Sequence, residues 1–435
     1  MKPADRVAPP LILEGARLID PGAGTDAPGW LLIEGGRIAA TGAPGDPCPE
    51  AARRHDCAGA CLAPGIVDLG VRIGEPGARH LESFRSAGRA AAAGGVTTIV
   101  TRPDTEPPVD TPEMLDYVRR RAASECAVRV APMAALTRAR AGREMAELGF
   151  LADGGAVAFS DGLRAVRDSR VLARVLRYAA GLGALIVTHP QDPWLSEGAA
   201  ATSGKFATLR GLPATPAMAE RIGLDRDLAL AGMAGARLHA DQITTADALA
   251  ALARAREAGL DVSAGTSIHH ATLNEFDIGP WRSFFKLTPP LRAEDDRRAV
   301  VAALADGTID ILCSMHTPCD EEAKRQPFEA AAAGAVGLET LLPAALRLCH
   351  GGDLSLPALF RALSLNPARR LGLEGGSLSP GAPADLVLFD AHAPFVLDRF
   401  TLTSKSRNTP FDGARLQGRV RASFVGGQQV YPMEG

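Results

Sequence analysis

The spacing of hydrophobic and polar residues changes twice along this chain and divides it into three parts. Near both ends, apolar and polar residues alternate in short runs that are interrupted by Gly, Asp and Pro. The clearest of these runs are Leu11–Asp20, Trp30–Gly42, Ala384–Asp390 and Val420–Tyr431. Alternation with a period of two predicts strands joined by hairpins. We therefore predict one small composite β-sandwich, built from residues 1–62 together with residues 371–435.

The middle of the chain, residues 63–370, alternates short apolar runs with amphipathic stretches rich in Ala, Arg and Leu. Eight of the apolar runs predict strands: Gly65–Ile73, Thr97–Pro103, Val128–Met133, Ala156–Asp161, Leu185–Pro190, Arg237–Thr244, Val262–Ile268 and Ile311–His316. Helices are predicted between them, for example over Phe84–Ala93, Val171–Ala180 and Ala246–Ala258. Eight strand–helix units over this length predict an α/β fold, a (β/α)8 TIM barrel.

Composition narrows the choice of function. The 435 residues are 46% hydrophobic, which supports a large core, and the net charge of −3 offers no basic surface for nucleic acid. The sequence shows neither an export leader nor an apolar run of about 18 residues, so we predict a cytoplasmic protein without a membrane segment. Seven scattered cysteines, an odd number, argue against a disulfide framework.

Chemistry in a TIM barrel lies at the C-terminal ends of the strands. Four of the predicted strands end near histidines, namely His189, His239, the pair His269 and His270, and His316, and three end near Asp68, Asp104 and Asp161. Such residues could hold a metal ion that activates water. However, the chain contains no paired motif such as HxH or HExxH, and a single buried histidine is more often a hydrogen-bonded core residue.

Ordered motifs along almost the whole chain carry a family resemblance. They are Pro64-Gly-Ile-Val-Asp68, Glu75-Pro-Gly77, Arg89-Ala-Ala-Ala-Ala-Gly-Gly-Val-Thr-Thr98, Ala158-Phe-Ser-Asp161, Gly211-Leu-Pro213, Phe285-Lys-Leu-Thr-Pro-Pro-Leu-Arg292, Asp306-Gly-Thr-Ile-Asp310, Gly337-Leu-Glu-Thr340, Asn366-Pro-Ala-Arg369, Gly376-Ser-Leu-Ser-Pro-Gly381 and Ser404-Lys-Ser-Arg-Asn-Thr-Pro-Phe411. By these motifs the chain resembles dihydroorotases of the long bacterial type, in the cyclic-amidohydrolase superfamily. The resemblance implies a barrel with a composite sandwich. It also implies zinc-dependent, reversible closure of N-carbamoyl-aspartate to dihydroorotate in pyrimidine biosynthesis.

The chain departs from the family where this chemistry takes place. The family pattern on the first strand is Asp-x-His-x-His-x-Arg, whereas this chain has Asp68, Gly70, Arg72 and Gly74. Arginine does not deprotonate in proteins and cannot bind a metal ion. The Arg that holds the substrate carboxylate in the family is absent at Gly74. Asp104 stands where the family has a substrate-binding Asn, and a carboxylate there repels an anionic substrate.

The later strands show the same kind of replacement. Relative to the family, Asp161 has lost its neighbour in the Asp-Asp pair, and Gln242 replaces a metal-binding His. Thr288 replaces a substrate-contacting Asn. Met315, which precedes His316, replaces the acid/base Asp. His189 is retained, and His239 is retained at the earlier position of its strand. If any metal binds, the remaining family ligands are Asp161 and His189, fewer than the three of an ordinary catalytic zinc site. We therefore expect no cofactor.

Two functional hypotheses follow from the resemblance. The first is a pseudoenzyme, a catalytically inactive dihydroorotase homologue that serves as a structural subunit with aspartate carbamoyltransferase in a homo- or hetero-oligomer. The alternative is an active cyclic amidohydrolase with a mononuclear zinc site drawn from Asp68, Asp161, His189, His239, His269 and His316. A hydantoinase or allantoinase is disfavoured, because those relatives need the same first-strand histidines.

The first hypothesis carries a structural expectation for the altered pocket. A buried arginine is costly unless a carboxylate pairs with it. We expect Arg72 to point into the space left by the metal, with Asp161 or, failing that, Asp104 or Asp68 as its partner. We expect Met315 to fill the volume of the missing acid, since methionine adapts well to irregular gaps.

Overall fold

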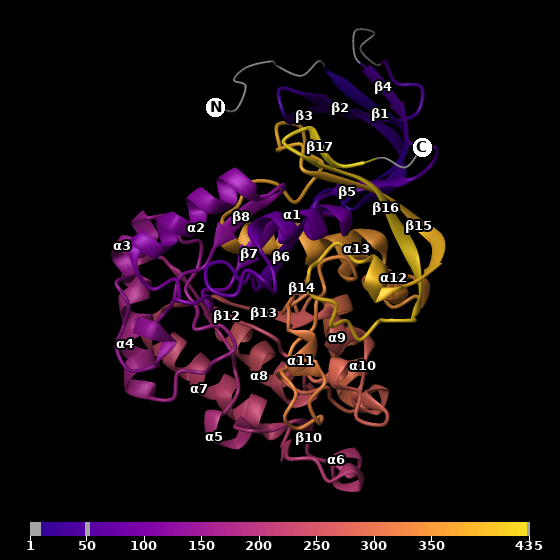
Figure 1. The fold of residues 1–435 in the computed structure, drawn as a ribbon. Helices are drawn as coiled ribbons and strands as arrows, with labels where there is room; N and C mark the ends of the chain where they lie inside the picture. The colour runs from indigo at the N-terminus through magenta and orange to yellow at the C-terminus, as the bar shows by residue number, and fades with distance from the viewer. Residues whose placement is uncertain (1–9, 48–52, 433–435) are drawn as a thin grey trace.

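The computed structural model of the protein describes residues 10–47 and 53–432. In Figure 1 the strands from the two ends of the chain, indigo and yellow, lie together at the top, and the middle of the chain lies below them. The strands from the two ends of the chain are therefore neighbours in space.

A single eight-stranded sheet joins the two ends of the chain. Its order is β17-β16-β15-β5-β1-β2-β3, with β4 also paired to β1. The strands are β1 (Leu11–Asp20), β2 (Thr25–Glu34), β3 (Arg37–Gly42), β4 (Arg53–Asp56), β5 (Cys61–Pro64), β15 (Leu386–Val396), β16 (Arg415–Val425) and β17 (Gln428–Tyr431). Because β5 pairs with both β1 and β15, it connects the N-terminal strands to the C-terminal ones. The strands predicted at both ends are confirmed.

The middle of the chain forms two parallel sheets. The first has the order β6-β7-β8 and the second has the order β14-β13-β12-β9. Their strands are β6 (Ile66–Val71), β7 (Val96–Thr101), β8 (Arg129–Pro132), β9 (Leu185–Thr188), β12 (Arg237–Ala240), β13 (Val262–Ser267) and β14 (Ile311–Cys313). These strands are shorter than predicted: β9 ends at Thr188 and not at Pro190, β12 at Ala240 and not at Thr244, and β14 at Cys313 and not at His316.

The predicted strand over Ala156–Asp161 is the exception. Only Phe159 pairs there, through isolated parallel bridges to Ala134 and Ile186 that lie between the two sheets. At its C-terminal end the Asp161 side chain accepts hydrogen bonds from the backbone of the loop after β8. The prediction of a full strand at this position was wrong, although the segment occupies the expected place.

The first and last parallel strands meet at their C-terminal ends. The backbone N–H of Arg72 donates to the carbonyl of His316 at 2.9 Å. The backbone N–H of Ser314 donates to Asp68 Oδ1 at 2.7 Å. The residues that follow β6 and β14 are thus held next to each other.

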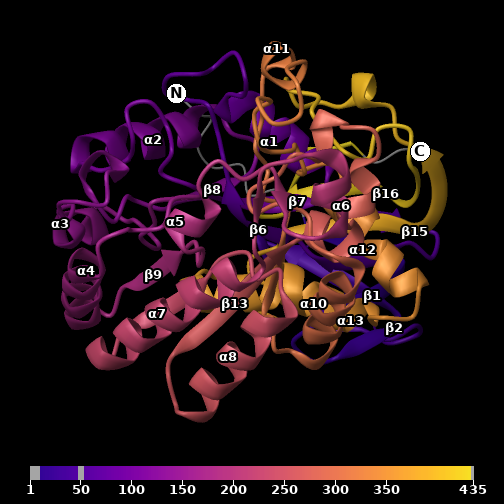
Figure 2. The same ribbon diagram turned by 90° about the horizontal axis from the view of Figure 1, so that it is seen from below.

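Helices follow most of the parallel strands. The longer ones are α1 (Phe84–Ala93), α2 (Pro112–Glu125), α4 (Ser169–Leu182), α7 (Met218–Ala234), α8 (Ala246–Glu257), α10 (Glu294–Asp306) and α12 (Leu341–His350). The shorter ones are α3 (Leu148–Asp153), α5 (Pro193–Ser196), α6 (Lys205–Arg210), α9 (Ile268–Thr272), α11 (Glu321–Lys324), α13 (Leu356–Phe360) and α14 (Asn366–Leu371). Figure 2 shows α4, α7 and α8 outside the parallel strands. The predicted helix Phe84–Ala93 is confirmed, and Ser83 begins it with a capping box.

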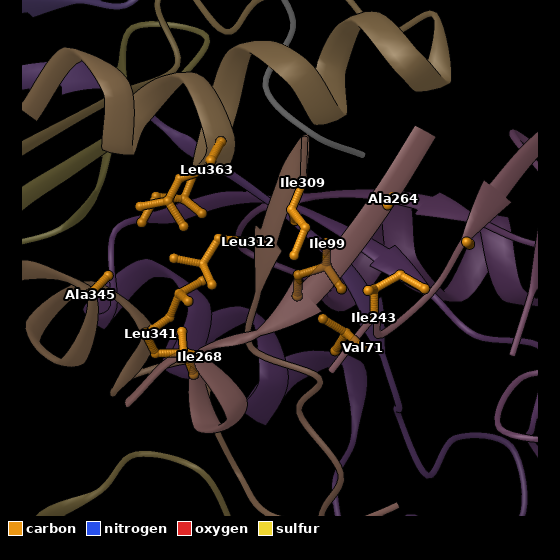
Figure 3. Close-up of a cluster of buried hydrophobic side chains, with 14 of the residues drawn as sticks. Val71, Ile99, Ile243, Ala264, Ile268, Ile309, Leu312, Leu341, Ala345 and Leu363 are labelled. Atoms are coloured by element: carbon orange, nitrogen blue, oxygen red, sulfur yellow. The ribbon is translucent and has the colours of Figure 1, made fainter. Parts of the chain in front are cut away.

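Alternate residues of the parallel strands pack on opposite sides. Figure 3 shows Val71, Ile99, Ala264 and Leu312 in a buried cluster that also contains helical residues such as Leu341. The alternate residues along the same strands point to the other side. They belong to a second cluster, which includes Val67, Leu69, Val100, Val187 and Met315. Because this interior is filled with side chains, the chemistry of the fold is confined to the ends of its strands.

Two further observations bear on the sequence analysis. Within the described residues, no helix is long and apolar enough to cross a membrane. All six described cysteines are free, and Cys48 lies outside the described residues.

Candidate functional site

Asp68 belongs to the scaffold of the strand ends. Its carboxylate accepts hydrogen bonds from the backbone N–H and the hydroxyl of Ser314. Burial raises the pKa of the Asp68 carboxyl to about 6, and the Ser314 hydrogen bonds offset part of that rise. Asp68 therefore ties β6 to the residue after β14.

Gly70 and Met315 lie against each other. A Cβ atom added at Gly70 would stand 2.5 Å from Met315 Sδ, far inside van der Waals contact. Both residues have left-handed backbone, with φ of 83° at Gly70 and 49° at Met315. Met315 is buried, and its sulfur lies in the space beside Gly70 at the end of β6.

Gly74 leaves no room for a side chain. A Cβ atom there would lie 2.2 Å from the carbonyl oxygen of Ala78, which belongs to the backbone and cannot rotate away. The arginine that the family pattern places at this position therefore cannot be accommodated without moving the loop.

Two arginines share Asp104. Arg72 Nε lies 3.8 Å from Asp104 Oδ2, and Arg102 Nη2 lies 3.2 Å from the same oxygen. The side chain of Arg72 is 33% exposed, whereas that of Arg102 is 1% exposed. Arg72 has a carboxylate partner, although it is Asp104 and not Asp161. The fully buried cation among the strand ends is Arg102.

The charge of Arg102 acts on groups from several strands. It helps to lower the pKa of His189 to about 3, after the larger effect of burial. Burial raises the pKa of the Asp241 carboxyl to about 6, and the Arg102 charge offsets part of this. The guanidinium also donates through Nη2 to Thr317 Oγ1 at 3.1 Å. Arg102 thus provides a fixed positive charge among the ends of β7, β9, β12 and β14.

Asp161 anchors a loop. Its Oδ1 accepts hydrogen bonds from the backbone N–H groups of Leu136 and Thr137, both at 3.0 Å, and its Oδ2 accepts one from the Thr137 hydroxyl. Burial raises the pKa of the Asp161 carboxyl, and these hydrogen bonds oppose the rise. Both oxygens are therefore engaged in holding the segment after β8.

The histidines do not converge on one point. His239 Nδ1 is 2.8 Å from Ser263 Oγ, and its pKa is lowered to about 3 by burial and then by Arg370 and Arg256, a different set of charges from those near His189. His316 Nδ1 accepts from the backbone N–H of Gly337 at 3.1 Å, while its Nε2 faces the buried Glu82 at 3.6 Å.

The pair on α9 is engaged in packing. The ring of His269 stacks on Phe411, with centroids 5.6 Å apart. His270 contacts Ser267 Oγ and the carbonyl of Pro289, at 2.8 and 3.1 Å. Both histidines are buried in these contacts.

Gln242 and Thr288 also meet. Gln242 Nε2 donates to the carbonyl of Thr288 at 3.2 Å, and Gln242 has a left-handed backbone with φ of 58°. This contact joins the end of β12 to the segment before Pro289, and it uses an amide where the family has a metal-binding imidazole.

The residues present do not fit the zinc site that the resemblance implies. In the described part of the chain, no three His, Cys, Asp or Glu side chains are grouped so that they could hold a metal ion. Asp161 is engaged with backbone amides, and Met315 fills the place beside Gly70. A catalytic zinc site ordinarily takes three protein ligands. Four of the candidate ligands keep a ring nitrogen that is buried without a hydrogen-bond partner among the described residues, namely His189 Nδ1, His239 Nε2, His269 Nε2 and His316 Nε2. Of these four, only His189 is one of the two remaining family ligands.

A cavity of about 390 Å³ opens beside these residues. Its lining includes Asp161, His189 and Thr288, together with Arg140, Arg164 and Arg167. The sequence analysis missed these three arginines, and it also missed Asp241 and the burial of Arg102. Asp241 could have been found, because it follows β12 directly and so lies at the C-terminal end of a parallel strand, where the chemistry of this fold is located.

Comparisons with known proteins agree with this architecture. A family model described as dihydro-orotase-like matches residues 59–248. The chain is 38% identical to a dihydroorotase of Syntrophus aciditrophicus, covering 97% of this chain and 99% of that protein. It is 40% identical to a dihydroorotase-like protein of Pseudomonas putida, with 97% and 99% covered.

Among solved structures, the L-hydantoinase of Arthrobacter aurescens is similar with a TM-score of 0.88 and 25% identity, over 98% of this chain and 96% of that one. That likeness supports an amidohydrolase fold of the TIM-barrel class. The chain belongs to the dihydroorotase-like family.

Proposed function

We propose that this member of the dihydroorotase-like family has lost dihydroorotase catalysis and acts as a structural subunit with aspartate carbamoyltransferase in pyrimidine biosynthesis. The observation that carries the proposal is the contact between Gly70 and Met315. The family's metal-binding histidine would begin with a Cβ at position 70, and Met315 Sδ lies 2.5 Å from that point. The position that would begin a metal site is therefore filled with an apolar side chain.

The charge at the strand ends supports the same proposal. A divalent cation brought among these strands would be repelled by the buried guanidinium of Arg102, and repulsion between charges is strong where water is excluded. The positive charge that a metal supplies in an active relative is here part of the chain. Asp104, the nearest carboxylate, already pairs with Arg102 and Arg72.

The groups for proton transfer and substrate binding are also replaced. Met315 has no titratable group where the family has its acid/base Asp. The backbone around Gly74 excludes the arginine that would hold a substrate carboxylate. Dihydroorotase chemistry needs both functions, so restoring one residue would not restore the reaction.

The framework supports a structural role. We propose that residues 63–370 form the (β/α)8 barrel domain, closed where Arg72 meets His316, and that residues 1–62 with 371–435 form the sandwich domain. A barrel whose interior is filled and whose end strands are tied by Asp68 and Ser314 is a rigid body with a defined surface. Such a body is suited to serve as an interface in a cytoplasmic oligomer.

The catalytic part of the proposal is tested by turnover. The purified chain is assayed with N-carbamoyl-aspartate and with dihydroorotate, with and without added Zn²⁺, beside an active dihydroorotase. We expect no turnover above the uncatalysed rate. Turnover within the ordinary range of enzymes, roughly 1–10³ per second, would overturn this part of the proposal.

The partner is tested separately. Co-expression with the aspartate carbamoyltransferase of the same cell should give one complex of fixed stoichiometry, measured by size-exclusion chromatography with light scattering. Elution of the two chains as independent species at micromolar concentration would contradict the structural role.

The unpartnered nitrogen of His189 favours one second candidate, an active amidohydrolase with a mononuclear zinc site. Burial keeps that imidazole neutral, the form that binds metals. This candidate predicts about one equivalent of bound zinc by metal analysis, lost in a His189→Asn variant. Metal content that is unchanged in the variant would dismiss it.

A further inference from the structure

The cavity beside the strand ends has an unusual lining for its size. Besides His189 and Thr288, three arginines border it, Arg140, Arg164 and Arg167. At about 390 Å³ it falls within the range of small-molecule sites. The replaced metal chemistry explains none of these arginines, because they lie on the segments after β8 and before α4.

The arginines are not neutralised equally. Arg167 Nη2 pairs with Glu197 Oε1 at 2.8 Å, so its charge is balanced. Among the described residues, no carboxylate lies within ion-pair distance of Arg140 or Arg164. Arg140 donates through Nε and Nη2 to the backbone carbonyl of Asp161, a neutral acceptor, and its Nη1 is left for another partner.

The surroundings add positive charge. Asp104, just behind the cavity, is shared by Arg72 and Arg102 and also feels the charge of Arg140. Burial lowers the pKa of Arg140; the charges of Asp104 and Asp161 oppose this effect, and those of Arg164 and Arg102 add to it. The carboxyl groups close to the four cations Arg72, Arg102, Arg140 and Arg164 are Asp104, Asp161 and Asp241, one fewer than the cations, so the region carries an excess of positive charge.

We propose that this cavity binds a small organic anion, whose carboxylate or phosphate group is held by Arg140 and Arg164. The planar guanidinium groups present several N–H donors in a geometry that matches two oxygens of such a group. An anion would balance the excess charge, and it would need no metal ion. The proposal is independent of the proposed function, since Arg140 and Arg164, which hold the anion, are not among the replaced catalytic positions, although the cavity also borders Asp161, His189 and Thr288.

Binding is tested by isothermal titration calorimetry on the full chain at low ionic strength, where screening is weak. Inorganic phosphate and malonate are titrated separately, with sodium chloride at matched ionic strength as the reference. The variants are Arg140→Gln and Arg164→Gln. Arg174→Gln is the control, because Arg174 is exposed on α4 and is not part of the cavity lining.

We expect saturable binding of phosphate, malonate or both, and the stronger of the two identifies the anionic group. Arg140→Gln and Arg164→Gln should each weaken it about tenfold or more, the effect of losing a hydrogen bond between charged groups. Arg174→Gln should leave it unchanged. If Arg140→Gln does not fold, the binding measured for Arg164→Gln, a change at an exposed position, tests the proposal alone. Failure of both anions to bind the unaltered chain, or an equal loss in Arg174→Gln, would overturn the proposal.

Discussion

Two arginines are buried in this molecule to the same degree, and the ion pairs that they form differ in how completely their polar groups are satisfied. Arg292 with Glu220 joins the segment before α10 to α7, and Arg102 with Asp104 lies at the end of β7. Both arginines are about 2% exposed. The Arg292–Glu220 pair stabilises the fold, whereas the Arg102–Asp104 pair lies where the catalytic residues of the family have been replaced.

The Arg292–Glu220 pair has partners on all sides. Glu220 accepts hydrogen bonds from the backbone N–H groups and hydroxyls of Thr244 and Thr245 and from Gln191. Arg292 donates to Thr244 Oγ1 at 2.9 Å and to Thr202 Oγ1 at 3.2 Å. A buried ion pair is stable when its remaining donors and acceptors are used in this way.

The Arg102–Asp104 pair is incomplete. Arg102 Nε and Nη1 and Asp104 Oδ1 are buried without hydrogen-bond partners among the described residues. A buried polar group without a partner carries a free-energy cost of about 1–3 kcal/mol. The difference between the pairs indicates that the strand-end pocket is not optimised for stability, whereas the network around Glu220 is.

The largest effect is expected from Glu220→Gln. This change leaves the Arg292 charge buried without a countercharge, so we expect the free energy of unfolding to fall by about 3–5 kcal/mol, measured by urea denaturation. Glu374→Gln is the control, because the Arg37–Glu374 pair is exposed and should contribute at most about 1 kcal/mol. Equal decreases in the free energy of unfolding in the two variants would show that the buried Glu220 network contributes no more to stability than an exposed ion pair.

The second test varies the pH and concerns Asp241, a buried carboxyl whose pKa is affected by the charge of Arg102. With a pKa of about 6, folded Asp241 holds its proton at pH values where the unfolded chain, with a pKa near 3.9, has released it. Its contribution to stability is therefore present at about pH 4 and is lost as the pH rises through about 6. Asp241→Asn removes this loss.

We expect the stability of Asp241→Asn relative to the unaltered chain to increase between pH 4 and pH 7, on the order of 2–3 kcal/mol. The free energy of unfolding is measured at each pH by denaturant titration. Asp153→Asn, at the exposed end of α3, controls for the change in net charge. A difference that stays constant over this range would show that Asp241 is not held in a protonated state.

The fold could be predicted from the sequence because its signals are local. Alternation predicted β1 to the residue, and the βα periodicity located the parallel strands. The segment Ala156–Asp161 forms isolated bridges at Phe159 and not a full strand, and no local pattern reports which of its residues pair with the two neighbouring sheets. The ends of the other strands were predicted less exactly than their positions.

The site could be predicted less completely. The absence of side-chain chemistry at Gly70 and Gly74 follows from residue identity, and the filling by Met315 followed from its size. Which arginine is buried did not follow, because Arg72 and Arg102 both end strands and only the closed arrangement of β6, β7 and β14 decides between them. The arginines of the cavity lie in loops, where sequence spacing carries little information about proximity.

The third test addresses the apolar filling of the pocket. Gly70→Ala introduces a Cβ close to Met315 Sδ at a left-handed backbone position, and we expect a loss of about 1–2 kcal/mol. The losses for Gly70→Ala and Met315→Ala should not add in the double variant, because removing the methionine side chain makes room for the new methyl group. A double-mutant cycle from thermal or urea unfolding measures this coupling. Strict additivity would show that the two residues do not compete for the same space.

The smallest effect, and the most direct test of the comparison, is expected from Arg102→Met. The change removes a buried cation together with its two unpartnered donors, and Asp104 keeps Arg72 at 3.8 Å and the charge of Arg140 nearby. The stabilisation lost with the ion pair and the stabilisation gained by removing the buried, unpartnered donors should therefore cancel. We expect the free energy of unfolding to change by no more than about 1 kcal/mol, as in other replacements of buried charges by apolar side chains. Arg292→Met is the matched variant, and it should lose several times more, since Glu220 then stays charged and buried without a cation. Urea denaturation of both variants decides, because equal losses would mean that Arg102 stabilises the fold as much as Arg292 does and is not a remnant of replaced chemistry.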